Sequence, residues 1–350
     1  LKVLSEQNNC RLADPGEFTK VAFQNDKIDL LKAESIGDLI HAETELQRDQ
    51  AVKLVQGNAS SYYNDLREKL IKSLSYIEAK IDFAEDDLPE KVLKEVQNSI
   101  KEIYKDIHRV IEDNKIGEKI RDGFRVSITG EVNAGKSSLL NLIAKRDVAI
   151  VSDEAGTTRD VIETYLNIDG YPVILADTAG IRDAKNEVEK KGISLALGKS
   201  KEADLNIVVI DNSSNNINNQ IKKMINKDTV LLLNKSDVQD KQNHKLDADT
   251  VVASVKENKN IDNLIKKIKE KLSKKFTSNN SALITRERHR VKLNECLKEI
   301  DNFLKKDQNK DLELAAEDLR LATRHLGSIV GKVDVEEILG SIFKDFCIGK

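Results

Sequence analysis

Residues 130–137 read Gly-Glu-Val-Asn-Ala-Gly-Lys-Ser. The spacing Gly-x-x-x-x-Gly-Lys-Ser is that of a phosphate-binding loop, whose backbone N–H groups wrap the phosphates of a nucleotide. In such a loop Lys136 reaches the outer phosphates and Ser137 offers its hydroxyl to Mg²⁺. The loop follows an alternating apolar stretch at 124–128 and opens a helix, whose positive dipole end points at the same anion. The segment therefore predicts a nucleotide-hydrolysing domain.

Strand patterns alternate with helix patterns after the loop. Short apolar runs typical of strands occur at residues 161–168, 173–176, 205–211, 229–233 and 250–253. Helical segments lie between most of them, which predicts a largely parallel sheet with helices on both faces. Ligands of such sheets bind at the C-terminal ends of the strands, and the phosphate-binding loop follows one of these ends.

Long amphipathic helices are predicted on both sides of this region. Apolar residues recur every three or four positions at 66–81, 93–110, 291–304 and 312–326. A further helix is expected at about residues 33–56, with Ile36, Leu39, Ile40 and Leu46 facing inward. This spacing is typical of helices that pack on other helices. We therefore expect the nucleotide domain to be inserted into a helical bundle that is built from both flanks.

The composition argues against several classes of protein. The 350 residues include no Trp, 3 Pro and 33% charged residues, which suits long solvated helices better than a β-sandwich. The net charge of −3 gives no global basic field, so an RNA contact would be a local patch or be made by a partner. Cys10, Cys296 and Cys347 are far apart and lack metal-ligand spacing, and no signal peptide or transmembrane run is visible. These features predict a cytoplasmic protein that does not use a membrane.

Four further motifs point to GTP. Residues 177–180 read Asp-Thr-Ala-Gly at the end of an apolar strand, as expected for the carboxylate that holds Mg²⁺ and the glycine amide that senses the γ-phosphate. Residues 234–237 read Asn-Lys-Ser-Asp. Asp237 can accept hydrogen bonds from N1–H and the 2-amino group of guanine, a pair that adenine lacks. Residues 254–256 supply a weaker base-contacting motif. Residues 156–160 supply the switch threonine that completes Mg²⁺ coordination.

The residue that orients the attacking water is not where a Ras-like GTPase has it. Such enzymes place a glutamine after Asp-Thr-Ala-Gly, but this chain has Ile181. Another side chain must position the water, and another cation must offset the charge that develops between the β- and γ-phosphates. Arg159 is one candidate for this cation, although a structural role in the switch loop fits it better.

Three strings carry a more specific resemblance. They are Gly-x-x-Asn-Ala-Gly-Lys-Ser-Ser-Leu-Leu-Asn at 130–141, Ala-Gly-Thr-Thr-Arg-Asp at 155–160 and the terminal Phe-Cys-Ile-Gly-Lys at 346–350. Together with strings within residues 15–30 and 313–320, they make the chain similar over nearly its whole length to the tRNA modification GTPases called MnmE or TrmE.

The resemblance implies a fold and a division of the chain. The fold is an α/β P-loop GTPase domain with a mostly parallel sheet, inserted into an all-α helical domain, together with a remnant of an N-terminal α+β domain. The remnant of this folate-binding and dimerisation domain takes residues 1–28, the helical domain takes 29–120 and 278–350, and the G domain takes 121–277. Because the chain begins at Leu1 and the family's other folate contacts would precede it, we expect most of the N-terminal domain to be missing.

The resemblance also implies a complete nucleotide and metal site. The residues expected to bind GTP are Asn133, Ala134, Gly135, Lys136, Ser137, Ser138, Ser152, Asp153, Glu154, Ala155, Gly156, Thr157, Thr158, Asp177, Thr178, Ala179, Gly180, Asn234, Lys235, Asp237 and Ser254. Mg²⁺ is expected at Ser137 and Thr158. A K⁺ ion, which would offset transition-state charge in place of an arginine finger, is expected at Asn133, Ser152, Glu154 and Thr157. Glu189 is expected to orient the water, and it is the expected catalytic residue together with Lys136.

The family works with a flavin protein, MnmG or GidA, that binds FAD and NADH. Together they are expected to add a carboxymethylaminomethyl- or aminomethyl-type group to carbon 5 of the wobble uridine of certain tRNAs. A tetrahydrofolate derivative supplies the carbon, and Lys27 and Lys350 are the folate-binding residues that this sequence retains. Family members are homodimers through the N-terminal domain and form a hetero-tetramer with the partner.

Two other functions compete with this interpretation. A GTPase that assembles ribosomes usually carries a basic RNA-binding module, and none is visible in the sequence. A scaffold that binds GTP without hydrolysing it would not need Lys136, Ser137, Thr158 and Asp177, which are all present. GTP hydrolysis that depends on K⁺, measured with and without a flavin partner and tRNA, would separate the three.

Overall fold

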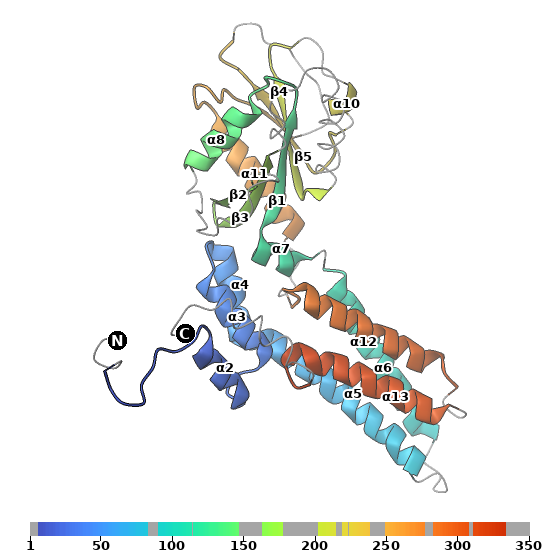
Figure 1. Cartoon of the computed structure of the whole chain (residues 1–350). Coiled ribbons are helices and arrows are strands. Elements are labelled where there is room, and N and C mark those ends of the chain that lie inside the picture. The colour runs from blue at the N-terminus through green and yellow to red at the C-terminus, as the bar shows by residue number, and fades with distance from the viewer. Residues whose placement is uncertain are drawn as a thin grey trace, which may run out of the picture. The chain divides into compact units, whose positions relative to one another are not determined.

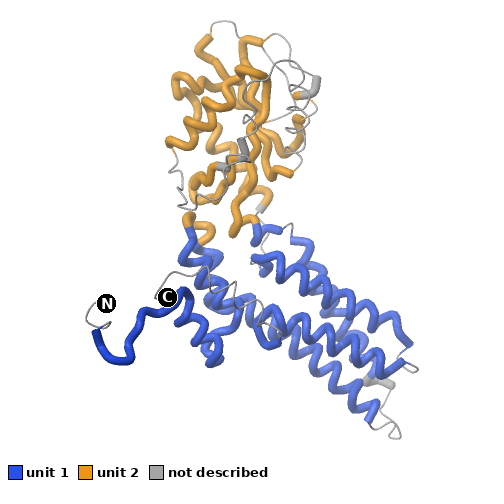
Figure 2. Tube along the Cα trace, viewed as in Figure 1, with its two compact units in different colours: residues 1–42, 48–118, 280–350 blue, residues 43–47, 119–279 orange. Residues whose placement is uncertain are grey.

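The computed structural model describes residues 6–82, 90–113, 115–146, 163–177, 202–214, 219–222, 224–238, 249–276, 283–307 and 311–333. The chain divides into two compact units (Figure 1, Figure 2). The helical unit comprises residues 1–42, 48–118 and 280–350, and the sheet unit comprises 43–47 and 119–279. The sequence predicts three domains with limits at residues 28, 120 and 277, and these limits stay predictions.

The helical unit is a bundle made by both flanks of the insertion. Its helices are α2 (Glu17–Gln24), α3 (Leu30–Ile40), α4 (Glu45–Val55, whose first turn belongs to the sheet unit), α5 (Asn58–Asp82), α6 (Glu90–Ile111), α12 (Glu287–Lys305) and α13 (Leu312–Val330). Helix α5 packs against α6 and α13, and α12 packs against the same two helices (Figure 1).

One apolar core joins the four long helices. Leu70, Ile100, Ile300 and Leu319, one from each helix, are fully buried in a single cluster. Burying each such side chain stabilises the fold by about 2 kcal/mol. The prediction of a bundle built from both sides of the insertion is confirmed.

The predicted stripe on α12 begins at the wrong residue. Val291 was expected to face inward, but its side chain is 42% exposed, whereas Leu293 is fully buried. Two residues along a helix correspond to about 200°, so Val291 lies nearly opposite Leu293. The buried stripe continues from Leu293 through Cys296 and Ile300 at intervals of three and four.

The single helix predicted at about 33–56 is two helices, α3 and α4. The Thr44 hydroxyl accepts a hydrogen bond from the Gln47 backbone N–H (3.3 Å), and the Gln47 side chain accepts one from the Thr44 N–H (3.2 Å). This reciprocal capping box starts a new helix. The inward face of α3 also differs from the prediction, because Leu39 is exposed while Glu34 is buried.

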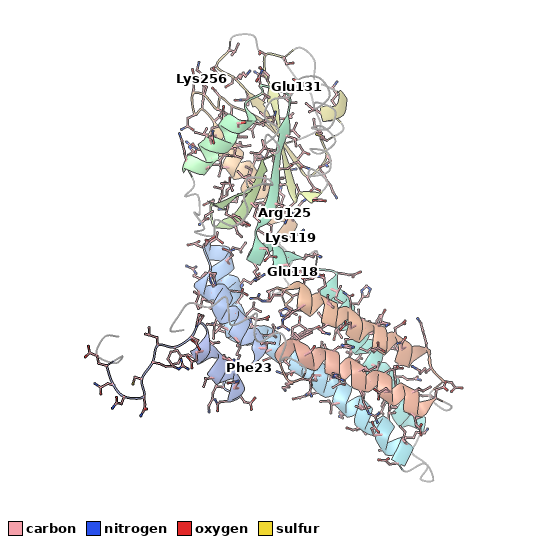
Figure 3. The ribbon with its side chains drawn as sticks, viewed as in Figure 1. Phe23, Glu118, Lys119, Arg125, Glu131 and Lys256 are labelled. Carbon is pink, nitrogen blue, oxygen red and sulfur yellow. The ribbon has the colours of Figure 1, made fainter. Side chains whose placement is uncertain are left out.

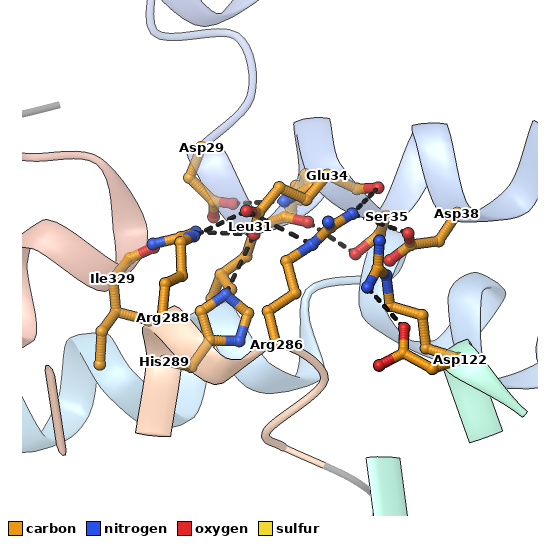
Figure 4. Close-up of polar contacts among 12 residues, drawn as sticks. Asp29, Leu31, Glu34, Ser35, Asp38, Asp122, Arg286, Arg288, His289 and Ile329 are labelled. Carbon is orange, nitrogen blue, oxygen red and sulfur yellow. Dashed lines mark hydrogen bonds and ion pairs between the residues drawn. The ribbon is translucent and has the colours of Figure 1, made fainter. Parts of the chain in front are cut away.

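The buried Glu34 is held by the start of α12 (Figure 4). Arg288 donates to both of its carboxylate oxygens (2.7 and 2.6 Å) and also to the Ile329 carbonyl at the end of α13. His289 Nε2 lies 3.0 Å from Glu34 Oε2, and Arg286 pairs with Asp38 at 2.7 Å. Burial would raise the pKa of Glu34, but the hydrogen bonds from His289 and Arg288 and the charge of Arg288 hold it well below its usual range. Glu34 is therefore ionised.

Arg290, one residue further along α12, holds the turn before α7 (Ile116–Asp122). Its guanidinium donates to both oxygens of Glu118 (2.9 and 2.6 Å), to Asp113 (2.8 Å) and to the Ile111 carbonyl (2.7 Å). Arg290 and Glu118 are both buried. Removal of one partner of such a buried pair leaves an uncompensated charge.

The sheet unit contains, among the described residues, a six-stranded sheet in the order β2-β3-β1-β4-β5-β6. The strands are β1 (Phe124–Gly130), β2 (Glu163–Ile168), β3 (Tyr171–Asp177), β4 (Leu205–Asp211), β5 (Thr229–Asn234) and β6 (Asp249–Val252). All pairings are parallel except that of β2 with β3, which form an antiparallel hairpin. Helices α8 (Lys136–Arg146) and α11 (Ile261–Phe276) pack on the sheet, and α10 (Asn219–Lys222) adds Ile221 to its core. The predicted strands and mostly parallel sheet are confirmed.

Lys119 in α7 is tied to the base of the sheet. Its ammonium pairs with Asp204 Oδ1 at 2.8 Å, while Asp204 Oδ2 accepts the Arg125 backbone N–H at 3.0 Å. Lys275, near the end of α11, donates to the Asp204 carbonyl at 2.5 Å. Asp204 therefore anchors both the start and the end of the sheet unit. Across the segments that the structure describes, no helix is both long and apolar enough to span a membrane.

The neutral state of His289 predicts a pH-dependent stability. Burial lowers the pKa of this fully buried side chain to about 4, below the 6.5 of an unperturbed histidine. Between these values the unfolded chain binds a proton that the folded chain does not, so the free energy of unfolding falls as the pH falls. We expect His289 to account for a loss of about 2 kcal/mol between pH 7 and pH 5, and His289→Gln to flatten this slope. Urea unfolding at pH 7, 6 and 5, followed by circular dichroism, measures how the free energy of unfolding changes with pH.

His108→Gln is the matched control, because His108 lies half-exposed on α6. Its pH slope should stay that of the unmodified chain. Equal slopes for His289→Gln and the unmodified chain would contradict the assignment.

Candidate functional site

Three described segments of the predicted site lie at the C-terminal edge of the parallel sheet. Strand β1 ends at Gly130, where the phosphate-binding loop begins, and β5 ends at Asn234. Glu131 in the first loop and Lys256 in the loop after β6 lie at the same end of the unit (Figure 3). The edge therefore brings together segments that are separated by more than a hundred residues.

Asn234 connects three of these segments. Its Nδ2 donates to the Ala134 carbonyl in the phosphate-binding loop at 2.8 Å. Its Oδ1 accepts the Val255 backbone N–H at 3.0 Å. Because Asn234 is only 3% exposed, both bonds are shielded from water, and the side chain fixes the phosphate-binding loop against the loop after β6.

The phosphate-binding loop needs its two glycines. Gly135 has φ +102°, and a Cβ there would collide with Asn234 Nδ2. Gly130 has φ +144°, and a Cβ there would collide with the Val209 carbonyl on β4. Both positions combine a left-handed backbone with a close approach, which only glycine tolerates.

The polar side chains of the loop lie around the first turn of α8. Lys136 Nζ donates to the Gly130 carbonyl (3.1 Å) and the Glu131 carbonyl (2.6 Å), which keeps the ammonium over the loop. Ser137 and Ser138 are exposed on the first turn of α8. Asn133 is exposed and has φ +61°, a conformation that asparagine tolerates better than most residues.

Asp237 and Ser254, the residues expected to contact the base, lie beside each other. The Ser254 hydroxyl, fully buried, donates to Asp237 Oδ1 at 2.6 Å and accepts the Glu257 backbone N–H at 3.2 Å. The hydrogen bond from Ser254 holds the pKa of Asp237 below its ordinary value. Asp237 is therefore an ionised acceptor whose orientation is set by a serine on a neighbouring loop.

Asp211, a charged residue at this edge of the sheet, was not predicted as part of the site from the sequence. Lys235 Nζ lies 2.6 Å from Asp211 Oδ2 at the end of β4. Asp211 follows the apolar run 207–210 of β4, as Asp177 follows the apolar run of β3, and this position was its sequence signal. No motif that we recognised contains it.

Part of the predicted site falls outside the described residues. This holds for Ser152, Asp153, Glu154, Ala155, Gly156, Thr157, Thr158, Thr178, Ala179, Gly180, Glu189 and Lys350. Asp177 is described as the last residue of β3, where it pairs in register with Ile128 of β1. Lys27 lies exposed in the turn after α2, in the helical unit. Within the described ranges, no group of three or more His, Cys, Asp or Glu side chains is arranged to hold a metal ion.

Comparison with known proteins identifies the family. The family model described as the MnmE helical domain matches residues 30–347. A tRNA modification GTPase MnmE of Pelagibacter ubique is 58% identical over an alignment that covers 99% of this chain and 79% of the relative. The chain belongs to the MnmE family of tRNA modification GTPases. The predicted family and the predicted class of enzyme, a GTP hydrolase, are therefore confirmed.

A second relative agrees with this membership. An MnmE protein of Rickettsia bellii is 44% identical, with 97% of this chain and 77% of the relative covered. Among solved structures, the G domain of the T. maritima FeoB iron transporter aligns with 43% of this chain and 98% of its own length, at 24% identity and a TM-score of 0.33. A likeness at that TM-score supports no conclusion about the MnmE chain.

Because a Cβ at position 135 would collide with Asn234 Nδ2, we expect nucleotide binding to require glycine at this position. In Gly135→Ala the new methyl group would displace Asn234 from Ala134 and Val255, so the affinity for GDP should fall by at least about 100-fold. Titration of a fluorescent GDP analogue measures the affinity. Gly57→Ala is the control, because Gly57 also has a positive φ (+95°) but a Cβ there meets only the flexible end of Lys32. Similar affinities for the two variants would contradict the argument.

Proposed function

We propose that this MnmE chain binds GTP at the edge of its sheet and hydrolyses it as part of a tRNA-modifying system. The observation that carries the proposal is the arrangement of Asp237. An ionised carboxylate, oriented by the buried Ser254 hydroxyl, lies three residues beyond the Asn234 side chain that holds the phosphate-binding loop. Base recognition and phosphate binding are thus coupled through one short segment.

Asp237 gives the site its preference for guanine. A carboxylate is an acceptor only, and guanine presents two neighbouring donors, N1–H and the 2-amino group. Adenine presents an acceptor at N1 and no amino group at position 2, so an ionised Asp237 would face a lone pair. A site built to hydrogen-bond specific donors rejects a base that lacks them strongly.

The phosphates would be bound by the loop and by Lys136. Its ammonium now donates to two loop carbonyls, and we propose that phosphate oxygens replace them when GTP binds. The hydroxyl of Ser137 is exposed, and with Thr158 and the carboxylate of Asp177 it would supply the oxygen donors that suit Mg²⁺. That ion would neutralise charge on the β- and γ-phosphates.

Asn133 is the residue we propose as the K⁺ ligand of the loop. Its left-handed backbone and exposed amide leave the side-chain oxygen available. Ser152, Glu154 and Thr157 would complete the oxygen donor set. A fixed monovalent cation there would offset transition-state charge, as an arginine finger does in other GTPases. We keep Glu189 as the residue that orients the attacking water.

The tRNA reaction extends this proposal beyond the nucleotide site. The names of the relatives connect them to tRNA modification, and we propose the same role for this chain, in the cytoplasm. The proposed system includes an MnmG-type flavin protein, a homodimer through the N-terminal domain and a tetrahydrofolate derivative bound near Lys27 and Lys350. The product is a carboxymethylaminomethyl- or aminomethyl-type group at carbon 5 of the wobble uridine.

Substitution of Asp237 should change the base preference. Asp237→Asn keeps an acceptor but replaces the other oxygen by a donor, which mismatches the 2-amino group of guanine and matches the 2-carbonyl of xanthine. We expect the affinity for GDP to fall by at least about 100-fold and XDP to become the better ligand. Competition with a fluorescent nucleotide measures both affinities. Asp262→Asn, at an exposed residue on α11, is the control, and an unchanged GDP preference in Asp237→Asn would exclude Asp237 as the base reader.

Hydrolysis should depend on the monovalent cation. GTP turnover should be at least about tenfold faster in KCl than in NaCl, and Asn133→Ala should abolish the difference while the chain still binds GDP. Equal rates in the two salts, or full K⁺ activation of Asn133→Ala, would contradict the assignment.

Single-turnover hydrolysis by Glu189→Ala tests the water-orienting role of Glu189. We expect the rate of hydrolysis to fall, and an unchanged rate would contradict that role.

The same assay with a flavin partner and tRNA separates the competing functions. For a tRNA-modifying GTPase we expect turnover to respond to the flavin protein and the wobble uridine to acquire its modification. Stimulation by ribosomal RNA alone would favour an assembly factor, and binding of GTP without turnover would favour a scaffold.

A further inference from the structure

The ion pair between Lys235 and Asp211 lies within the proposed base-recognition segment, and the inference drawn from it rests on the proposed GTP site. The two side chains are 36% and 21% exposed, and their charged atoms are 2.6 Å apart. Ion pairs of this exposure contribute little to stability. The position of this ion pair beside the base-recognition residues is therefore more informative than its contribution to stability.

Asp211 is itself rigidly held. It is the last residue of β4 and lies in register with Asn234, the last residue of β5. Its Oδ1 accepts hydrogen bonds from the Ser213 backbone N–H (3.0 Å) and hydroxyl (2.7 Å), which leaves Oδ2 for Lys235. Burial opposes its charge, but the hydrogen bonds from Lys235 and Ser213 outweigh burial and keep the pKa of Asp211 below its usual value. The carboxylate is thus a fixed negative charge that faces the lysine.

Lys235 lies between two fixed recognition residues. Asn234 before it is bound to Ala134 and Val255, and Asp237 after it is bound to Ser254. Lys235 itself has φ +65°, which sets the direction of its side chain. A lysine can cover an apolar surface with its stem while its ammonium stays on a polar partner. A base whose edge is read by Asp237 would present its face as the apolar surface for that stem.

We propose that Asp211 is a positioning residue for guanine-nucleotide recognition. It holds the ammonium of Lys235 so that the four-carbon stem is laid out as a platform for the base face, while Asp237 reads the base edge. Asp211 acts through Lys235 and does not touch the nucleotide. Its contribution is the reduced freedom of Lys235 before the nucleotide arrives, which lowers the entropic cost of binding.

The test compares Asp211→Asn with the unmodified chain. The variant keeps the shape and loses the charge, so we expect the Kd for GDP and the KM for GTP to rise about tenfold, with kcat at saturating GTP within about twofold. The ratio of GTP to ITP affinity should stay constant, because ITP lacks only the 2-amino group that Asp237 reads. Asp211→Glu, which can still reach Lys235, should recover part of the affinity.

Two controls separate positioning from a loss of stability. Asp249→Asn removes an acidic residue that pairs with Lys271 at 2.7 Å in the same unit but outside the recognition segment, and it should bind GDP normally. In a double-mutant cycle, Asp211→Asn should add nothing to Lys235→Met, because the two residues act as a unit.

Three results would overturn the proposal: normal GDP binding by Asp211→Asn, equal weakening by Asp249→Asn, or additive effects of Asp211→Asn and Lys235→Met. Normal GDP binding by Asp211→Asn in a chain whose Asp237→Asn variant loses its preference for GTP over ITP would overturn this proposal alone. If the unmodified chain does not bind GTP, the proposed function fails and this inference fails with it.

Discussion

The helical unit depends on ion pairs between residues that are far apart in the sequence. Arg288 binds Glu34 across 254 residues, and Arg290 binds Glu118 across 172 residues. Both pairs are largely shielded from water, so removal of one partner would cost about 3–5 kcal/mol, more than any single surface pair. The start of α12 thereby attaches the second half of the unit to α3 and to the turn before α7. The inserted sheet unit begins one residue after that second attachment.

Buried polar contacts between distant segments also organise the candidate nucleotide site. Asn234 and Ser254 are both buried polar residues, and each is hydrogen-bonded to a neighbouring loop. Neither needs to touch the nucleotide in order to matter, because Asn234 fixes the phosphate-binding loop and Ser254 fixes Asp237, the proposed reader of the base. The candidate site is therefore pre-organised by strand ends, and we expect its specificity to depend on contacts between loops as much as on the motif residues themselves.

The sequence could predict the parts of this structure that follow from local patterns. Apolar runs located the strands, and the spacing of the phosphate-binding loop located the end of β1. The break between α3 and α4 was visible in principle, since Thr44 and Gln47 form a capping box, but the apolar spacing masked it. Glu34 could not be predicted as buried, because its arginine partner is 254 residues away. The pairing of Lys235 with Asp211 likewise depends on the register of two strands, which no short motif records.

Helix α7 carries Glu118 and Lys119 side by side in sequence (Figure 3). Glu118 is bound by Arg290 in the helical unit, and Lys119 is bound by Asp204 in the sheet unit. Successive side chains on a helix point about 100° apart, so adjacent residues of this one short helix reach two separate sets of partners. The division between the two units therefore falls between Glu118 and Lys119. A G domain exchanged between relatives would have to keep Lys119 with Asp204 and leave Glu118 with Arg290.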